Sequence, residues 1–288
     1  MMIVKAAAKI NLMLDILEKL DNGYHSLFMI MQSVGIYDTV TVNQTSDGGI
    51  SLSCSNKNLP TGQSNIAFKA AMAFFDESKC ENSGIHIDIQ KRIPMEAGLA
   101  GGSADAAAVI LALDKIYNTH MPLKKLCKIG QKVGADVPFC IQGGTMLALD
   151  VGGVLAQLPD LPQCYIVLAK PSQGVSTAKA YAMYDEVDSC HHLDTNAMLR
   201  TMVNGDLRDI CSMMGNVFEQ FIEVSERVKI KNIMRENNSI GHCMSGSGPT
   251  VFGIFENERD ALNCEGQLKK TMDDVFVCRP VSQGCEFE

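Results

Sequence analysis

A cluster of glycines lies between a strand pattern and a helix pattern, and it constrains the fold of this chain more than any other feature. In residues 85–90 (IHIDIQ) isoleucines alternate with polar residues, which is the period of a half-buried strand. Residues 104–117 (ADAAAVILALDKIY) are rich in alanine and large aliphatic residues and favour a helix. Between them, Gly98, Gly101 and Gly102 lack β-carbons, so a ligand can approach the main chain. Because the first turn of a helix has unpaired N–H groups and a positive dipole end, the segment predicts a phosphate site.

The spacing of these glycines differs from that of two common nucleotide-binding motifs. No Lys-Ser/Thr pair follows them, as it would in a P-loop, and the GxGxxG pattern of a dinucleotide fold is missing. Glycine-rich turns between a strand and a helix also occur for purely structural reasons. The segment by itself therefore leaves a structural turn and a phosphate site open.

Length and charge limit the class of protein. The 288 residues are enough for two domains, and Gly and Pro cluster in residues 152–163 (GGVLAQLPDLPQ). We therefore predict domains at residues 1–155 and 156–288. The net charge of −8 argues against a nucleic-acid-coating surface, so we expect no nucleic-acid partner.

The cysteines and the N-terminal segment indicate a compartment. Eleven cysteines are scattered singly without a CxxC pair, which predicts neither a zinc site nor a disulfide framework and fits a reducing compartment. Lys9, Asn11 and Asp15 interrupt the first apolar run, so we expect neither a signal peptide nor a membrane span. We expect a cytoplasmic protein without a membrane partner.

The remaining patterns mix strands and helices. Residues 1–17 predict an extended edge followed by a second strand. Further strands are expected at 29–42, 50–54, 145–151, 164–169, 241–244, 250–255 and 275–281. Helices are expected at 65–76, 123–133, 178–184 and 259–272, with two or three more within 197–235. This mixture predicts an α+β sandwich with helices on one face of a largely antiparallel sheet.

Polar residues interrupt three of these segments. Lys9 and Asn11 stand inside a predicted strand, which either has one solvated face or carries a site. Tyr24 and His25 follow the predicted turn at residues 21–23 (DNG). They are either part of a packed hairpin or a stacking surface with a hydrogen-bonding group for a flat ligand. Asp136, in GADVPF, is either a local cap or a partly desolvated acid that needs a cation.

Four segments, in order, resemble the GHMP small-molecule kinase superfamily over nearly the whole chain: AKINL, GLAGGSADAA, GADVPF and MSGSGPTVFG. The combination of AKINL, NGYH and GADVPF is most similar to the branch that acts on a diphosphocytidyl-linked methylerythritol. The resemblance implies a two-domain α+β GHMP kinase fold, with an N-terminal ribosomal-S5-like domain and a C-terminal ferredoxin-like α/β sandwich. It also implies ATP-dependent phosphorylation, with Mg²⁺, of the 2-hydroxyl of that cytidine-diphosphate-linked polyol, on the non-mevalonate route to isoprenoid precursors.

The same resemblance implies roles for individual residues. Asp136 would accept the proton of the substrate hydroxyl. Lys9 would orient the Asp136 carboxylate and the attacking oxygen, and it would stabilise charge. ATP would contact Asn65, Lys91, Pro94, Glu96, Ala97, Gly98, Leu99, Ala100, Gly101, Gly102 and Ser103. The acceptor would contact Asn11, Tyr24, His25, Asp136, Tyr181, Ser245 and Gly246, where residues 245–248 could also be a simple inter-strand turn.

Two residues depart from the family pattern, and two other classes stay open. Ala100 stands where many members carry glycine, and Glu96 adds a negative charge beside the loop. We expect no metal site made by protein alone, because Mg²⁺ would be held by phosphates and water. The alternatives are a homoserine or mevalonate-type kinase, a related decarboxylase, or a non-catalytic nucleotide sensor. A monomer or weak homodimer is expected.

Overall fold

The computed structural model describes residues 1–21, 23–187 and 189–288. Asn22, part of the predicted turn at 21–23, lies outside the described residues. In the described part of the chain no helix is long and apolar enough to cross a membrane.

The first sheet is built on a long antiparallel pair, β1 (Met2–Lys19) and β2 (His25–Gln44). Its main path runs β12-β1-β2-β4-β3, where β3 is Ile50–Cys54, β4 is Ile85–Gln90 and β12 is Cys285–Phe287. Three more strands attach to it, β5 (Thr145–Asp150) on β2, β6 (Val154–Gln157) on β5, and β8 (Gly215–Asn216) on β1. The β3–β4 and β1–β8 pairs are parallel and the others antiparallel.

Strand β1 differs from the prediction of an edge followed by a second strand. It is one strand that pairs with β2 along its length and with β12 on its other side. The register shifts at three places, between Ala7/Ala8, Asn11/Met13 and Ile16/Glu18. Such bulges bend a strand without ending it, which explains why the pattern suggested two pieces.

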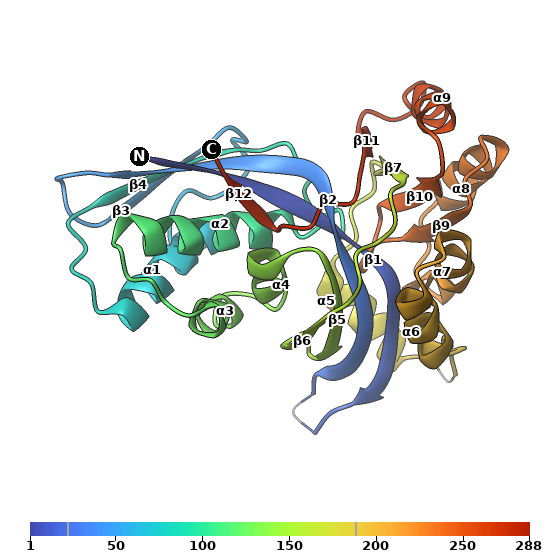
Figure 1. The fold of residues 1–288 in the computed structure, drawn as a ribbon, viewed down its shortest axis with the longest axis horizontal. Helices are drawn as coiled ribbons and strands as arrows, with labels where there is room; N and C mark the ends of the chain where they lie inside the picture. The colour runs from blue at the N-terminus through green and yellow to red at the C-terminus, as the bar shows by residue number, and fades with distance from the viewer. Residues whose placement is uncertain (22, 188) are drawn as a thin grey trace.

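Four helices cover one face of the first sheet (Figure 1). They are α1 (Ile66–Ser78), α2 (Gly101–Ile116), α3 (Leu123–Gln131) and α4 (Val137–Gln142). The central helix α2 begins three residues earlier than predicted, directly after Ala100, and its alanines and aliphatic residues are buried. The short helix α4 was not predicted, because six residues with a proline at the start show no helical period.

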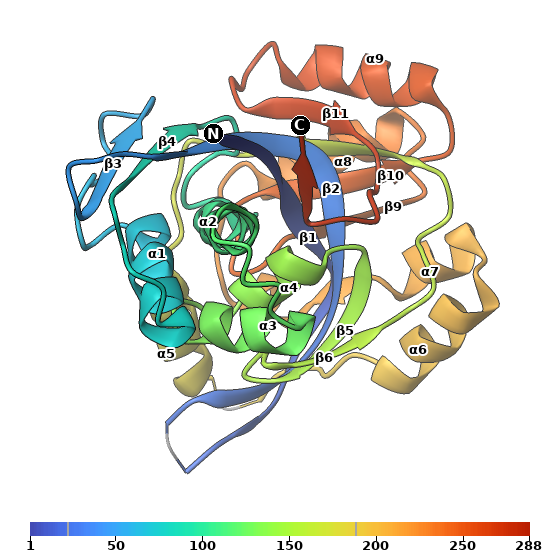
Figure 2. The same cartoon turned by 60° about the vertical axis from the view of Figure 1, so that its left-hand side comes forward.

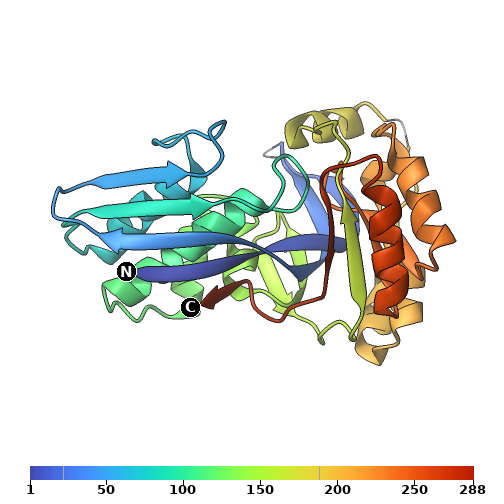
Figure 3. The ribbon, with the colours of Figure 1, turned by 90° about the horizontal axis from the view of Figure 1, so that it is seen from above.

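The second sheet has the order β11-β7-β10-β9 and packs its outer face on two helices (Figure 3). Its strands are β7 (Tyr165–Ala169), β9 (Gly241–Met244), β10 (Val251–Phe255) and β11 (Val275–Cys278), and the helices are α8 (Arg227–Glu236) and α9 (Glu258–Leu268). Val167 and Ala169 join the core beneath these helices, whereas Ile166 and Leu168 join the main core with the first sheet. The two-residue period of β7 thus links the two layers.

The remaining elements are α5 (Thr177–Asp185), α6 (Thr195–Asn204), α7 (Leu207–Met213) and a 3₁₀ turn, η1 (Val217–Gln220). The α+β class with largely antiparallel sheets is confirmed. The predicted domain boundary stays a prediction, and β8 and β12, from the second half of the chain, lie in the first sheet.

The two ends of the chain lie close together (Figure 2), because β12 pairs with the start of β1. The segment before β12 is tightly packed against α4. A β-carbon on Gly284 would lie 1.9 Å from the carbonyl oxygen of Cys140, and one on Gly143 would lie 1.9 Å from the Gly284 nitrogen. The backbone of residues 283–285 therefore fits closely against the end of α4.

Candidate active site

One cleft of about 1390 Å³ brings the predicted site residues together. All of them except Ser245 line it, although they come from β1, the start of β2, the N-caps of α1 and α4, the glycine loop, α2, α5 and the turn after β9. The structure thus gathers residues that are up to 237 positions apart, from Lys9 to Gly246 (246 − 9), around one space.

The glycine loop reaches α2 through left-handed backbone conformations. Glu96, Gly98 and Ala100 have φ angles of 48°, 72° and 57°. Ala100 is the N-cap of α2, and its side chain makes no capping hydrogen bond. The N–H groups in the first turn of α2 are therefore not capped by that side chain. Ala97 and Leu99 are buried and anchor the loop in the core. The loop and the start of α2 therefore have the geometry of an anion cradle.

The carbonyl oxygen of Gly98 receives two hydrogen bonds at its back. Lys9 Nζ and Ser245 Oγ each donate to it over 2.9 Å. Ser245 is fully buried and does not line the cleft, so its hydroxyl holds the loop from behind. This corrects the expectation that Ser245 faces a substrate, while Gly246 does line the cleft.

Lys9 is a buried cation that lines the cleft. Its ammonium donates to Asn11 Oδ1 over 2.8 Å, and both residues are buried, so the alternative of a solvated strand face is wrong. Burial lowers the pKa of Lys9 below its usual value, while the charge of Asp136 acts in the opposite direction. The amide nitrogen of Asn11 is buried without a hydrogen-bond partner among the described residues, and a ligand could satisfy it.

Asp136 immediately precedes α4 and does not cap it. Its side chain makes no capping hydrogen bond, so the alternative of a local cap is wrong and the carboxylate faces the cleft. Its charge acts on Lys9 on one side and on Tyr181 on the other. Among the described residues, Lys9 and Asp136 form no ion pair within 4.0 Å, although both line the cleft.

Lys91 lies beneath the loop between two buried carboxylates. Its ammonium contacts Asp38 closely and lies 2.6 Å from Asp105 Oδ2. Burial alone would lower the pKa of Lys91, but Asp105 and Asp38 together raise it above its usual value. Burial raises the pKa of Asp105 well above its usual value, and its Oδ1 has no partner among the described residues. Asp38 Oδ1 also accepts from the backbone N–H groups of Arg92 and Ile93, which fixes the start of the loop.

Aromatic rings form a wall at another part of the cleft. His25 stacks on Tyr181 with ring centroids 5.2 Å apart, and Tyr181 rests edge-on against Phe218 at 5.1 Å. His25 Nε2 lies 2.9 Å from Asp185 Oδ1, and Lys19 Nζ lies 2.7 Å from the other oxygen of that carboxylate, Oδ2. The bonds from Lys19 and then His25 hold the pKa of Asp185 below its usual value. Tyr24 lines the same part and is 65% exposed.

Asn65 has a structural task besides lining the cleft. It is the N-cap of α1, accepting from the Ala67 N–H over 2.9 Å and donating to the Pro60 carbonyl over 2.8 Å. Its side chain is therefore fixed in place where α1 meets the cleft.

The chain matches two family descriptions: "GHMP kinases N terminal domain" over residues 65–144 and "GHMP kinases C terminal" over residues 198–274. The chain belongs to the GHMP kinase family. Two curated relatives are each 42% identical over 280 residues, the 4-diphosphocytidyl-2-C-methyl-D-erythritol kinases of Clostridium acetobutylicum and Acetivibrio thermocellus. The matches span 96% of this chain and 99% and 98% of the relatives.

Solved structures give the same fold to this GHMP kinase. A 4-(cytidine 5'-diphospho)-2C-methyl-D-erythritol kinase matches with a TM-score of 0.79 and 29% identity, over 96% of this chain and 98% of the other. Homoserine kinase from Cytophaga hutchinsonii matches with a TM-score of 0.81 and 19% identity, over 100% and 97%. The second likeness concerns the fold alone, and the predicted two-domain α+β GHMP kinase fold is confirmed.

Sequence reasoning missed several residues around the site of this GHMP kinase. Asp105 lies inside the GGSADAA string and was quoted without a role, while Asp38, Asp185, Asn216 and Phe218 stand in segments without a motif. Their contacts cross from one element to another, so a local pattern could not reveal them.

Proposed function

We propose that this GHMP kinase transfers the γ-phosphoryl group of ATP to the 2-hydroxyl of 4-diphosphocytidyl-2-C-methyl-D-erythritol. The observation that carries the proposal is a single cleft that joins three parts: the glycine loop, the Lys9–Asp136 pair and the His25–Tyr181 stack. The full-length likeness to kinases of that name supports the choice of acceptor.

The size of the cleft supports two substrates. A typical site for one small ligand has about 300–1,000 Å³, and this cleft has about 1390 Å³. ATP would lie along the loop and the start of α2, where Asn65 and the Lys91 side chain line the wall. The acceptor would occupy the part lined by Tyr24, His25 and Tyr181.

Asp136 would accept the proton of the attacking hydroxyl. Its carboxylate faces the cleft without a capping bond, and its charge acts to raise the pKa of both Lys9 and Tyr181, which supports a role between the two ligands. The Lys9 ammonium would orient the carboxylate and the attacking oxygen, and it would stabilise charge on the transferring group. Its bonds to Asn11 Oδ1 and Gly98 O fix it in that position.

The aromatic wall suits a flat base. Tyr181 is held by Phe218 on one side and His25 on the other, so an acceptor's cytosine would meet preorganised rings. The bond between His25 and Asp185 would fix the imidazole, which can present its other nitrogen to the edge of a base. An acceptor without a base would leave this wall unused, which favours the cytidyl acceptor over homoserine or mevalonate.

The residues present fit a Mg²⁺ ion carried by ATP. The described residues contain no group of three His, Cys, Asp or Glu side chains that could hold a metal, and Mg²⁺ is usually held by substrate phosphates, water and one or two carboxylates. Glu96, Ser103 and Asp136 line the cleft and offer oxygen atoms for one or two coordination positions. Bound with ATP, Mg²⁺ would neutralise phosphate charge.

The proposal is tested by measuring phosphate transfer from ATP by the purified protein with Mg²⁺, with the cytidyl acceptor, homoserine and mevalonate offered in parallel. We expect transfer to the cytidyl acceptor alone. Transfer to homoserine or mevalonate would keep the phosphate chemistry and refute the base-binding role of His25 and Tyr181. ATP binding without transfer to any acceptor would favour a nucleotide sensor. The cytoplasmic location and the monomer or weak homodimer stay predictions.

A further inference from the structure

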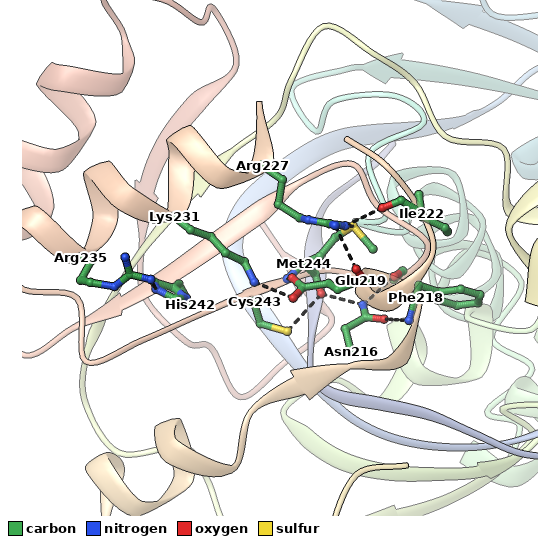
Figure 4. A network of polar contacts seen from close by, with 11 residues as sticks. Asn216, Phe218, Glu219, Ile222, Arg227, Lys231, Arg235, His242, Cys243 and Met244 are labelled. Carbon is green, nitrogen blue, oxygen red and sulfur yellow. Dashed lines mark hydrogen bonds and ion pairs between the residues drawn. The ribbon is translucent and has the colours of Figure 1, made fainter. Parts of the chain in front are cut away.

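A single buried amide connects two walls of the cleft. Asn216 lies at the end of β8, where it pairs with Leu14 of β1, and its Nδ2 donates to the carbonyls of Met244 over 2.8 Å and Gly246 over 2.7 Å. Its Oδ1 accepts from the N–H of Phe218 over 3.0 Å (Figure 4). All the polar atoms of this side chain are therefore used.

The segment that carries Asn216 is held firmly by its neighbours. Glu219 Oε1 accepts from the Met244 N–H over 2.7 Å, and its Oε2 lies 2.5 Å from Lys231 Nζ. Arg227 donates to the carbonyls of Glu219 and Ile222 (Figure 4). Helix α8 thus fixes η1 against β9, and the amide has little freedom to adjust.

One end of this connection reaches the catalytic lysine. The turn after β9 packs directly on the glycine loop, where a β-carbon on Gly246 would lie 3.2 Å from Gly98 and 3.3 Å from Lys9 Nζ. The adjacent Ser245 hydroxyl donates to the same Gly98 carbonyl that accepts from Lys9. The position of this turn therefore determines where Lys9 and the loop stand.

The other end reaches the aromatic wall. Phe218 is buried, and its ring supports Tyr181, which in turn stacks on His25. The hydrogen bond from the Phe218 N–H to Asn216 fixes the backbone from which this ring projects.

We infer that Asn216 is a positioning residue that sets Lys9 and the glycine loop through its donor nitrogen, and the base-binding wall through its acceptor oxygen. The inference rests on the proposed function. The inference assigns a different effect to each end of the Asn216 side chain. Nδ2 acts on the chemical step, and Oδ1 acts on binding of the cytidyl acceptor.

Two variants test this division. N216D keeps an oxygen for the Phe218 N–H but turns a second oxygen toward the Met244 and Gly246 carbonyls, so the turn must move. We expect kcat to fall roughly 10- to 100-fold, while KM for the acceptor changes less than about threefold. N216A also removes the oxygen that accepts the hydrogen bond from the Phe218 N–H. We therefore expect a further effect, a rise of roughly five- to tenfold in KM for the cytidyl substrate.

Asn237→Asp is the matched control. Asn237 is another buried asparagine whose Nδ2 donates to a backbone carbonyl, that of Ile233, and it does not line the cleft. N237D should lose a similar amount of stability, measured by thermal unfolding, with kcat and KM close to those of the wild type. Circular dichroism gives the folded fraction, by which each kcat is corrected.

The results distinguish the inference from the proposed function. A kcat for N216D that equals that of N237D, with an active wild type, would overturn the role of Asn216 alone. Equal KM values for N216D and N216A would overturn the assignment of the oxygen to the aromatic wall. A wild type that transfers no phosphate to the cytidyl acceptor would refute the proposed function, and with it the step that Asn216 is inferred to position.

Discussion

Gly98→Ala is the substitution whose effect the geometry defines most sharply. Gly98 has a φ of 72°, in the left-handed region. A β-carbon there would lie 2.1 Å from the carbonyl oxygen of Ser245 and 3.2 Å from that of Gly248. Because such carbon–oxygen contacts need about 3.3 Å, the loop or the turn must shift by roughly 1 Å. Both partners are backbone, so no side-chain rotation can relieve the contact.

The expected loss follows from the contacts that this shift breaks. Left-handed strain on alanine costs about 1 kcal/mol after the change in the unfolded chain is included. The shift also breaks the bonds from Lys9 Nζ and Ser245 Oγ to the Gly98 carbonyl, which are each 2.9 Å long. A bond from a charged group contributes about 1.5–3 kcal/mol and a neutral one about 0.5–1.5. We expect a loss of about 3–5 kcal/mol in the free energy of unfolding, and a fall in kcat/KM of roughly 100-fold.

Urea unfolding followed by circular dichroism, together with steady-state kinetics, measures both quantities. Gly205→Ala is the control, since Gly205 has a φ of 75° at the end of α6 and nothing lies within 4 Å of its β-carbon position. G205A should cost about 1 kcal/mol and leave activity unchanged. If G98A behaves like G205A in both assays, the close contact between the loop and the turn is refuted.

Three further predictions concern single side chains. D136N and K9A should each lower kcat by roughly 10²- to 10⁴-fold while calorimetry finds ATP affinity nearly unchanged, and full activity in either variant would refute the role proposed for that residue. A100G removes left-handed strain at a φ of 57° but frees the unfolded chain, so thermal unfolding should find a gain of about 0–1 kcal/mol; a clear loss would contradict this account of Ala100. Since burial raises the pKa of Asp105, the native protein keeps a proton that the unfolded chain releases above about pH 4, and stability falls as pH rises through this window. Because the amide that replaces the carboxyl group in D105N does not titrate, the stability of D105N in urea should rise relative to that of the wild type as the pH increases above about 4, by at most about 1.4 kcal/mol per pH unit. A difference in stability that does not change with pH would refute the raised pKa.

The sequence predicts the fold best where a pattern is local. Strands β3 and β4 have the predicted bounds, because apolar and polar residues alternate along both of them. Strand β9 also has its predicted bounds. The prediction failed for β1, which is buried on both faces and bulged, so no alternation appears. It also missed β8, since two residues pair with β1 only in the folded chain.

The same distinction applies to the site. The glycine loop, Lys9 and Asp136 stand in recognisable strings, and the structure brings all three to one cleft. The side chains that hold them do not form strings. Ser245 was expected to face a ligand but bonds to Gly98 behind the loop, and this contact joins residues 147 positions apart. Burial and partner are properties of the packed chain, so the supporting residues could not be found beforehand.

The close packing of Gly284 on α4 has a consequence for biosynthesis. Asp136 immediately precedes α4, and the far end of that helix rests on backbone that the ribosome adds about 140 residues later (284 − 143 = 141). The acid therefore stands on an unfinished support from its own synthesis until residue 284 is added, which is about half of translation. A polypeptide released between Asp136 and Gly284 would carry the glycine loop and Asp136. It would lack strand β12, which pairs with the start of β1, and the backbone that packs against the end of α4.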